Sequence, residues 1–359
     1  MISSNIFIVF LCLLGHANVT VKPFSAYFRA AKVAPYRTDL SSNSQIDISI
    51  NAVDLEDRTF LINFYKDKGY EIIDKETGMI FERSFSGTPS FFKNQNNIYY
   101  FGPTYYYTRI GDIFYPLHQK VGNAINLSQA VILQRAFSKQ INEIEKMDFL
   151  KNSEMKKPSS KSDSISYIPN YTRIKNDPYP DNWDNTCGFV AASIVFHYWD
   201  VYASGHIVAQ QFKNINGQLN STLYYSPSTN LKDKLVEYNG GNNASWGYPV
   251  RDSMVDYCND HNVTHNVWWG VGKYTPTSSL DNELLNGRPV IIFGLLPDQE
   301  TLGFIAHAVT AYGWHIYESI IGSYIVNYGW SEEATNEVEI NIGLVGSITT
   351  FQPLSWPTC

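Results

Sequence analysis

The feature that most constrains the fold is an uncharged run of thirteen residues, Cys187–Trp199 (CGFVAASIVFHYW). The run is apolar on every side when wound at about 3.6 residues per turn, which is typical of a helix buried on most of its surface. Asn185 or Thr186 can cap its first turn. Because 44% of the 359 residues are hydrophobic, the chain can surround such a helix. The run therefore predicts a central helix.

Short apolar segments bounded by Gly, Pro and Asn follow this run. Candidate strands are Asn266–Gly270, Pro289–Leu295, Ala308–Gly313 and Tyr324–Asn327, and Asp252–His261 is expected to be a further helix. One buried helix followed by a set of strands predicts an α+β domain, which we place at residues 168–359.

The first half of the chain is richer in strand patterns. Tyr70–Asp74 and Met79–Ser84 flank a turn that ends in Gly78, which predicts a hairpin. Further strands are expected at Ile98–Phe101 and Tyr105–Arg109, and an amphipathic helix from Leu127. These patterns predict a β-rich N-terminal domain at residues 18–150. Residues 151–167, rich in Ser and Lys, are expected to be an exposed linker.

The first residues predict export. Ile6–Leu14 is an apolar run followed by the small residues Gly15 and Ala17, although no Lys or Arg precedes it. We expect a signal peptide at residues 1–17 and a secreted, extracellular or cell-surface protein; the alternative is a buried N-terminal strand. After cleavage three cysteines remain, so at least one is unpaired. Cys258 and Cys359 are expected either to pair or to be inert.

Composition excludes several classes of partner. The net charge of -7 argues against a nucleic-acid partner, which would need a basic surface. The body of the chain has no apolar run long enough for a membrane span. It also has no Gly-rich phosphate loop and no Cys/His spacing typical of zinc. We therefore expect no cofactor and no metal.

Cys187 stands at the first turn of the predicted central helix, where the helix dipole favours thiolate over thiol. The alternative is a small buried apolar residue. A thiolate needs a proton acceptor, and His307 precedes an apolar strand from which its ring can be aimed at a helix terminus. The other histidines are less suitable: His197 lies ~15 Å along the helix, His118 lies in the first half, His206, His261 and His265 lie in polar stretches, and His315 lies beyond the next turn.

Asn327-Tyr328-Gly329-Trp330 ends the last of these strands. The side-chain carbonyl of Asn327 can accept a ring N–H of His307 and fix its tautomer. Trp330 can shield that bond from water. The alternative is a strand that ends in an aromatic-packed turn without chemistry.

In this order, Cys187, His307, Asn327 and Trp330 resemble the papain-like cysteine peptidases. The motifs Arg288-Pro289-Val290, His307-Ala308 and Val326–Trp330 are most similar to the streptopain family, over about residues 181–343. The resemblance implies a Cys-bearing helix packed on an antiparallel sheet. It also implies a secreted endopeptidase that cleaves protein or peptide substrates through a Cys-His-Asn acyl-enzyme mechanism.

The same resemblance implies a zymogen. Residues 18–150 would then be a propeptide that packs on the catalytic domain, and residues 151–167 would contain the processing site. Two positions depart from the family. Ala306 stands where Gly is usual, and Asp181 stands where the family has the Gln of the oxyanion hole. A carboxylate cannot donate, so Asn182 is the expected replacement donor; the alternatives are Asn185 or a hole formed by backbone N–H alone, with Asn182 merely capping its turn.

Two other functions fit the same residues. A Cys-His acyltransferase of the transglutaminase kind, or a bacteriocin-processing peptidase, shares this layout but often has Asp as the third member. A catalytically inactive binding module for glycans or surface proteins would explain Asp181 and the abundance of Tyr, Trp and Asn.

Overall fold

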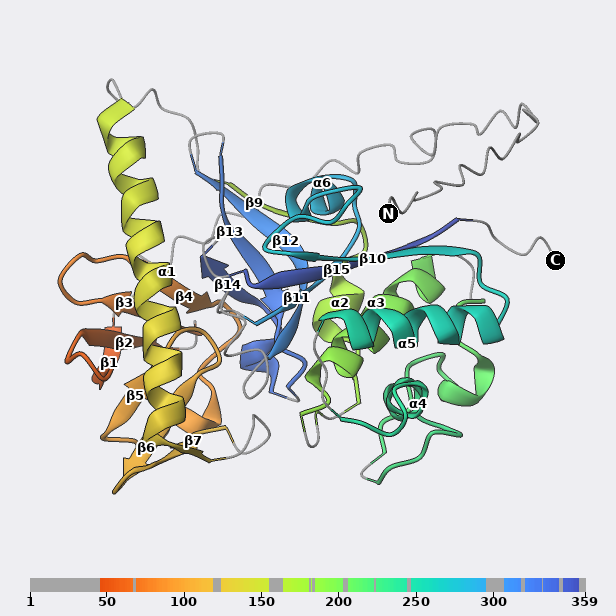
Figure 1. The fold of residues 1–359 in the computed structure, drawn as a ribbon, viewed down its shortest axis with the longest axis horizontal. Coiled ribbons are helices and arrows are strands. Elements are labelled where there is room, and N and C mark those ends of the chain that lie inside the picture. The colour runs from red at the N-terminus through yellow and green to blue at the C-terminus, as the bar shows by residue number, and fades with distance from the viewer. Residues whose placement is uncertain are drawn as a thin grey trace, which may run out of the picture. The chain divides into compact units, whose positions relative to one another are not determined.

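The computed structural model describes residues 46–66, 69–118, 124–154, 164–180, 182, 185–202, 206–222, 224–243, 247–294, 307–317, 320–330, 332–341 and 345–354. The fold is mixed α/β, with a large sheet and several helices (Figure 1). The predicted signal peptide, Cys359, Asp181 and Ala306 lie outside the described residues. Among the described helices, none combines the length and apolarity needed to cross a bilayer.

Fifteen strands of the described residues form one connected sheet, in the order β10-β15-β11-β12-β13-β14-β4-β3-β2-β1-β5-β6-β7-β8, with β9 paired to β12. The described pairings are antiparallel apart from β1 with β5, which is parallel. The strands are β1 (Ile46–Val53), β2 (Thr59–Tyr65), β3 (Gly69–Asp74), β4 (Ile80–Ser84), β5 (Ile98–Tyr100), β6 (Tyr106–Ile110), β7 (Ile113–Pro116), β8 (Ile125–Asn126), β9 (Ser164–Tyr167), β10 (His265–Val271), β11 (Val290–Phe293), β12 (Ala308–Tyr317), β13 (Ile320–Asn327), β14 (Val338–Asn341) and β15 (Ser347–Pro353).

Helices cover this sheet. They are α1 (Leu127–Glu154), α2 (Thr172–Asn176), α3 (Cys187–Tyr202), α4 (Leu231–Tyr238), α5 (Gly247–Asp260) and α6 (Leu280–Leu285), with short 3-10 helices η2 (Ser90–Phe92), η3 (Gln210–Phe212) and η4 (Glu333–Thr335). In Figure 1, α3 and α5 lie on one side of the strands β10, β15, β11 and β12, and α6 lies on the other.

Helix α3 confirms the central helix expected from the uncharged run. Every residue from Cys187 to Asp200 is buried, and the helix packs against β11, β12, α4 and α5. The carbonyl of Thr186 accepts the N–H of Val190 at 3.0 Å, so the helical hydrogen bonds begin there. At the other end, the Asp200 carboxylate accepts the N–H groups of Ile207 and Val208, which holds the chain that leaves the helix.

The expected strands of the C-terminal half are present as β10, β11, β12 and β13, and α5 begins earlier than Asp252. In the first half, β3 and β4 form the expected hairpin, in which the N–H of Gly78 donates to Asp74 O at 2.9 Å and Gly78 has φ +72°. Helix α1 begins at Leu127, as expected. It adds Phe137 to an aromatic core with Phe60, Phe81 and Tyr100.

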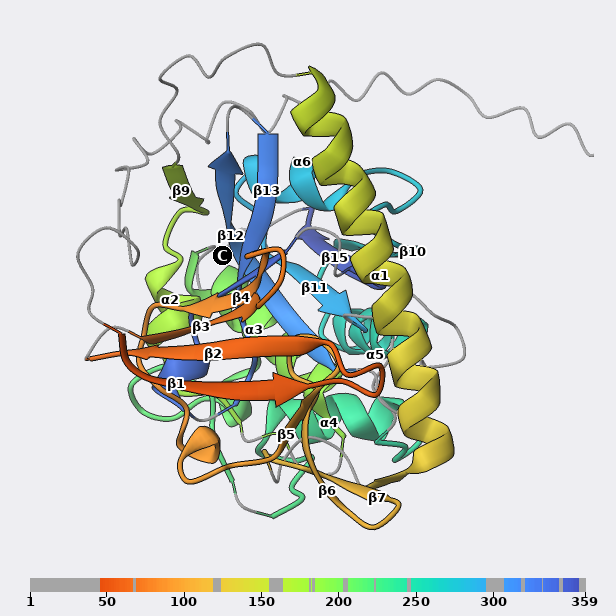
Figure 2. The same ribbon diagram turned by 90° about the vertical axis from the view of Figure 1, so that its left-hand side faces the viewer.

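Strands from the two halves of the sequence pair directly. Ser84, Arg83 and Glu82 of β4 are in register with Val338, Glu339 and Ile340 of β14. Figure 2 shows β4, β3, β2 and β1 side by side beyond this junction. The segment expected as a linker differs at both ends, because α1 continues to Glu154 and β9 pairs with β12 from Ser164. Residues 155–163 lie outside the described part of the chain.

Candidate active site

Cys187 is the first residue of α3 and is 4% exposed. The backbone N–H of Ala308, the first residue of β12, donates to Cys187 Sγ at 3.3 Å. Both this donor and the positive end of the helix dipole stabilise a negative sulfur. The sulfur thus has a backbone N–H donor and a helix N-terminus beside it, and its role as a nucleophile stays a prediction.

His307 directly precedes Ala308, so the hydrogen bond from Ala308 brings the Cys187 and His307 segments together. The backbone of His307 is fixed at its carbonyl, which accepts the N–H of Gly294 at 2.9 Å. Its N–H donates to the hydroxyl oxygen of Tyr105 at 3.5 Å. Tyr105 belongs to the loop between β5 and β6, in the first half of the chain.

The tautomer of His307 follows from its ring contact. Nε2 lies 3.1 Å from the backbone oxygen of Tyr328. A carbonyl only accepts, so Nε2 carries the proton. Burial lowers the pKa of His307 to about 3, with a smaller contribution from His118, and the ring is neutral at pH 7. The other ring nitrogen, Nδ1, is therefore unprotonated at pH 7.

Asn327 does not accept from His307, which differs from the sequence expectation. Its Oδ1 accepts the N–H of Gly329 at 2.7 Å, and its Nδ2 donates to Ile174 O of α2 at 2.7 Å. The side chain closes a turn over its own backbone, as Asn commonly does. That turn presents the carbonyl of Tyr328 to His307. Asn327 is thus a positioning residue for the turn, and Tyr328 supplies the acceptor.

Gly329 allows this turn to approach the central helix. Its φ is +67°, and a Cβ there would lie 3.0 Å from Cγ1 of Val190 on α3. Both the positive φ and the close approach favour glycine. The turn that holds His307 is therefore packed directly on the helix that carries Cys187.

Trp330 lies beside His307, with ring centroids 5.2 Å apart. It is 2% exposed, which places a large apolar surface over the imidazole. Two side chains from the first half of the chain cover Trp330 in turn. His118 stacks on it at 4.2 Å, and Phe91 of η2 meets it edge-on at 5.7 Å.

Asn182 is buried near the start of α3. Its Oδ1 accepts a hydrogen bond from the hydroxyl of Thr186 at 3.3 Å. This contact does not use the NH2 group of Asn182, which is the donor end of the side chain. Thr186 is the residue before Cys187. The side chain thus contacts the residue that precedes Cys187, and its role as an oxyanion donor stays a prediction.

A buried carboxyl lies behind the His307 turn. Glu82 of β4 accepts the hydroxyls of Tyr70 and Tyr106, and burial raises its pKa to about 7. Burial, and then the charge of Glu82, raises the pKa of Tyr328, the residue whose carbonyl holds His307. Sequence patterns did not point to Glu82, because they cannot show that β4 pairs with β14.

The other candidate residues are structural. Cys258 on α5 is free and fully buried, and burial raises the pKa of its thiol, which makes it inert. His197 contacts Asp177 at 3.0 Å, while Nδ1 of His261 and of His265 each donates to a nearby backbone carbonyl. Within the described ranges, no group of three or more His, Cys, Asp or Glu could hold a metal ion.

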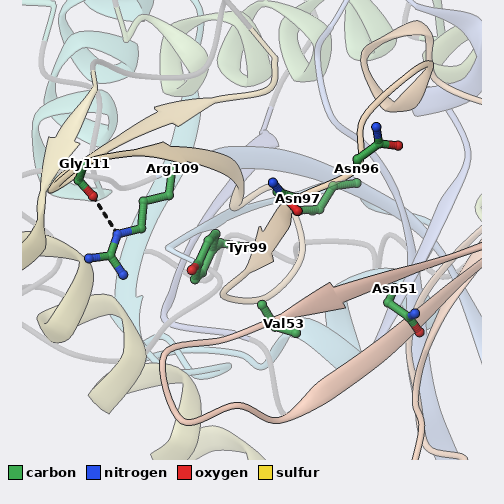
Figure 3. A pocket seen from close by; sticks show the side chains of 8 residues that line it. Asn51, Val53, Asn96, Asn97, Tyr99, Arg109 and Gly111 are labelled. Atoms are coloured by element: carbon green, nitrogen blue, oxygen red, sulfur yellow. Dashed lines mark hydrogen bonds between the residues drawn. The ribbon is translucent and has the colours of Figure 1, made fainter.

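A polar cavity of about 610 Å³ lies in the first half of the chain, away from Cys187. Figure 3 shows Tyr99 in its middle, Arg109 bonded to the carbonyl of Gly111 on one side, and Asn51, Asn96 and Asn97 on the other. None of the residues described above for the Cys187 site lines it.

No protein-family model and no curated protein sequence matches the chain. Among solved structures, a fragment of prointerpain A from Prevotella intermedia is similar at 12% identity and a TM-score of 0.42. The match covers 87% of this chain and all of that one.

Proposed function

We propose that this chain is a secreted cysteine endopeptidase of the papain-like kind, with Cys187 as nucleophile and His307 as general base and acid. One observation carries the proposal: the N–H of the residue after His307 bonds the sulfur at the N-terminus of a buried helix. This bond sets the His307 backbone beside the sulfur at the positive end of a helix, which supports the proposal because a thiol is activated by a nearby base and a helix N-terminus.

The proposed reaction proceeds in two steps. His307 Nδ1 takes the proton of the thiol, and the sulfur attacks the peptide carbonyl carbon. The C–N bond breaks as His307 gives the proton to the leaving amine, which leaves a thioester on Cys187. Water, deprotonated by His307, then hydrolyses the thioester. The hydrogen bond to Tyr328 keeps Nε2 protonated, so Nδ1 is the nitrogen that exchanges the proton.

We further propose that the chain is made in a latent form, with residues 18–150 as propeptide and a processing site within residues 151–167. Supporting contacts come from Tyr105, His118 and Phe91, which cover His307 and Trp330. Cys187 and His307 are 4% and 3% exposed, so a peptide needs these covering side chains to move before it can reach the sulfur.

The test compares the full chain with Cys187→Ala. We expect the wild type to cut casein and to yield a mature N-terminus within residues 151–167, and the variant to do neither. Iodoacetamide should label Cys187 of the processed protein faster than a small free thiol, and His307→Ala, processed by added wild-type enzyme, should lose that advantage. A full chain without hydrolysis, with Cys187 no more reactive than a free thiol, would identify the inactive binding module instead. Transfer of glutamine acyl groups to an added amine, in place of hydrolysis, would identify the acyltransferase.

A further inference from the structure

A second cavity of about 610 Å³ adjoins the candidate active site. The turn at residues 175–180, the Gly329–Trp330 turn and residues around η4 form its walls. Gly329 and Trp330 directly follow Tyr328, whose carbonyl accepts from His307. The cavity therefore lies on the His307 side of the nucleophile.

Two charged residues of this cavity already have partners. The ammonium of Lys175 bonds the carboxylate of Glu337. The carboxylate of Asp177 contacts His197 at 3.0 Å and Arg173 at 3.5 Å. Neither group presents an uncompensated charge to a ligand.

Glu333 differs from these two. It is exposed on η4 and lines the cavity. Its carboxylate has no hydrogen bond or ion pair with any residue in the described part of the chain. With Lys175 and Asp177 of opposite sign, Glu333 leaves the cavity one net negative charge.

The remaining walls suit a long side chain. Pro178 and Tyr179 offer apolar and aromatic surface to an aliphatic stem. An aromatic face also attracts a cationic head group. A lysine or arginine side chain matches both features, because its stem is apolar and its end is positive.

We infer that this cavity binds a basic side chain, lysine or arginine, of the peptide substrate, with its charge at Glu333. The inference rests on the proposed peptidase function and names the substrate class. Because His307 protonates the leaving amine, the substrate residues beside it lie on the C-terminal side of the cleaved bond. We therefore place the basic residue in the leaving fragment.

The first experiment uses the full chain after it has processed itself. Quenched fluorescent peptides carry Lys, Arg, Gln or Glu at the first two positions after the cleaved bond. We expect kcat/KM for the basic peptides to exceed that for the Gln peptides on the order of fivefold, the range of a partly exposed ion pair. Glu333→Gln should remove this preference, and Glu333→Lys should reverse it in favour of Glu. The control variant Asp256→Asn, which removes an exposed carboxylate on α5, should leave the preference for basic peptides unchanged.

A second experiment does not depend on cleavage. The cavity is present with both halves of the chain in place, so the full-length Cys187→Ala variant can be titrated with acetyl-Ala-Lys-Ala-amide and its Glu counterpart. Tryptophan indole NMR signals should shift with the Lys peptide, and the additional substitution Glu333→Gln should weaken that response several-fold.

The outcomes separate the two proposals. Cleavage without a basic preference, or with a preference that Glu333→Gln leaves intact, overturns the inference and leaves the peptidase standing. Binding of the Lys peptide that Glu333→Gln weakens, without any cleavage by the wild type, supports the cavity assignment and overturns the peptidase.

Discussion

His118 stacks on Trp330 with ring centroids 4.2 Å apart and planes 12° apart. The two residues lie far apart in sequence, on opposite sides of the segment 151–167. Trp330 also contacts the ring of His307, so only the Trp330 side chain separates His118, from the first half, from the proposed general base. This stack gives the proposed latent state a specific contact that can be removed.

His118→Ala should loosen the cover over the site. A stacked aromatic pair contributes about 1 kcal/mol beyond the area it buries, so its loss should raise the population of the open form about fivefold. We expect iodoacetamide to label Cys187 of the unprocessed chain about fivefold faster. The matched control is His265→Ala, on the edge strand β10, which should label at the wild-type rate. Equal labelling of His118→Ala and wild type would show that this stack does not control access.

Sequence alone could predict the elements whose patterns are local. The uncharged run identified α3 because burial on all sides leaves no room for a charge, and the Gly78 turn identified the β3–β4 hairpin. The position of Cys187 at a helix start followed from the same run. The choice of His307 depended on motif order and stays a prediction; in the structure the next residue, Ala308, donates to Cys187 Sγ.

The parts that sequence missed depend on distant contacts or on a single turn. Tyr105, Phe91 and His118 of the first half contact His307 or Trp330, and β4 pairs with β14; no local pattern encodes contacts over such sequence distances. From the sequence, the side chain of Asn327 was expected to face His307 and accept its ring N–H. An Asn two residues before a Gly also matches a side-chain-to-backbone turn, and the structure has that turn instead.

Asn182→Ala tests the predicted oxyanion donor. We expect acylation to fall by ~10²-fold, since one donor to the oxyanion is lost. Alkylation of Cys187 by small haloacetamides builds no oxyanion and should be nearly unchanged. Thr186→Val removes the hydroxyl that holds Asn182 Oδ1, so it should give a smaller loss in the same assay. Full peptidase activity of Asn182→Ala would remove this residue from the site.

Asn327→Ala should lower turnover far less than Cys187→Ala, because Asn327 positions a turn whereas Cys187 forms the covalent bond. The substitution leaves the half-buried N–H of Gly329 and the buried carbonyl of Ile174 without their partner. The free energy of unfolding should therefore fall by about 1–3 kcal/mol. Thermal denaturation and turnover measured on the same preparations check both effects. Equal losses of turnover in the two variants, with the fold intact, would contradict this assignment.

Glu82 should make the stability of the chain depend on pH. The folded pKa of about 7 lies above the ordinary value of 4.5, so the protonated carboxyl is the form that the fold favours. Its contribution is present below pH 4.5 and is lost as the pH rises through 7, by up to about 3 kcal/mol. Glu82→Gln cannot ionise, so its free energy of unfolding should not fall across this interval. The control is Glu76→Gln in the exposed β3–β4 turn, which should retain the wild-type pH dependence. Denaturant unfolding at pH 5, 6, 7 and 8 measures the difference, and a wild type whose stability stays constant from pH 5 to 8 would mean that Glu82 is not the titrating group.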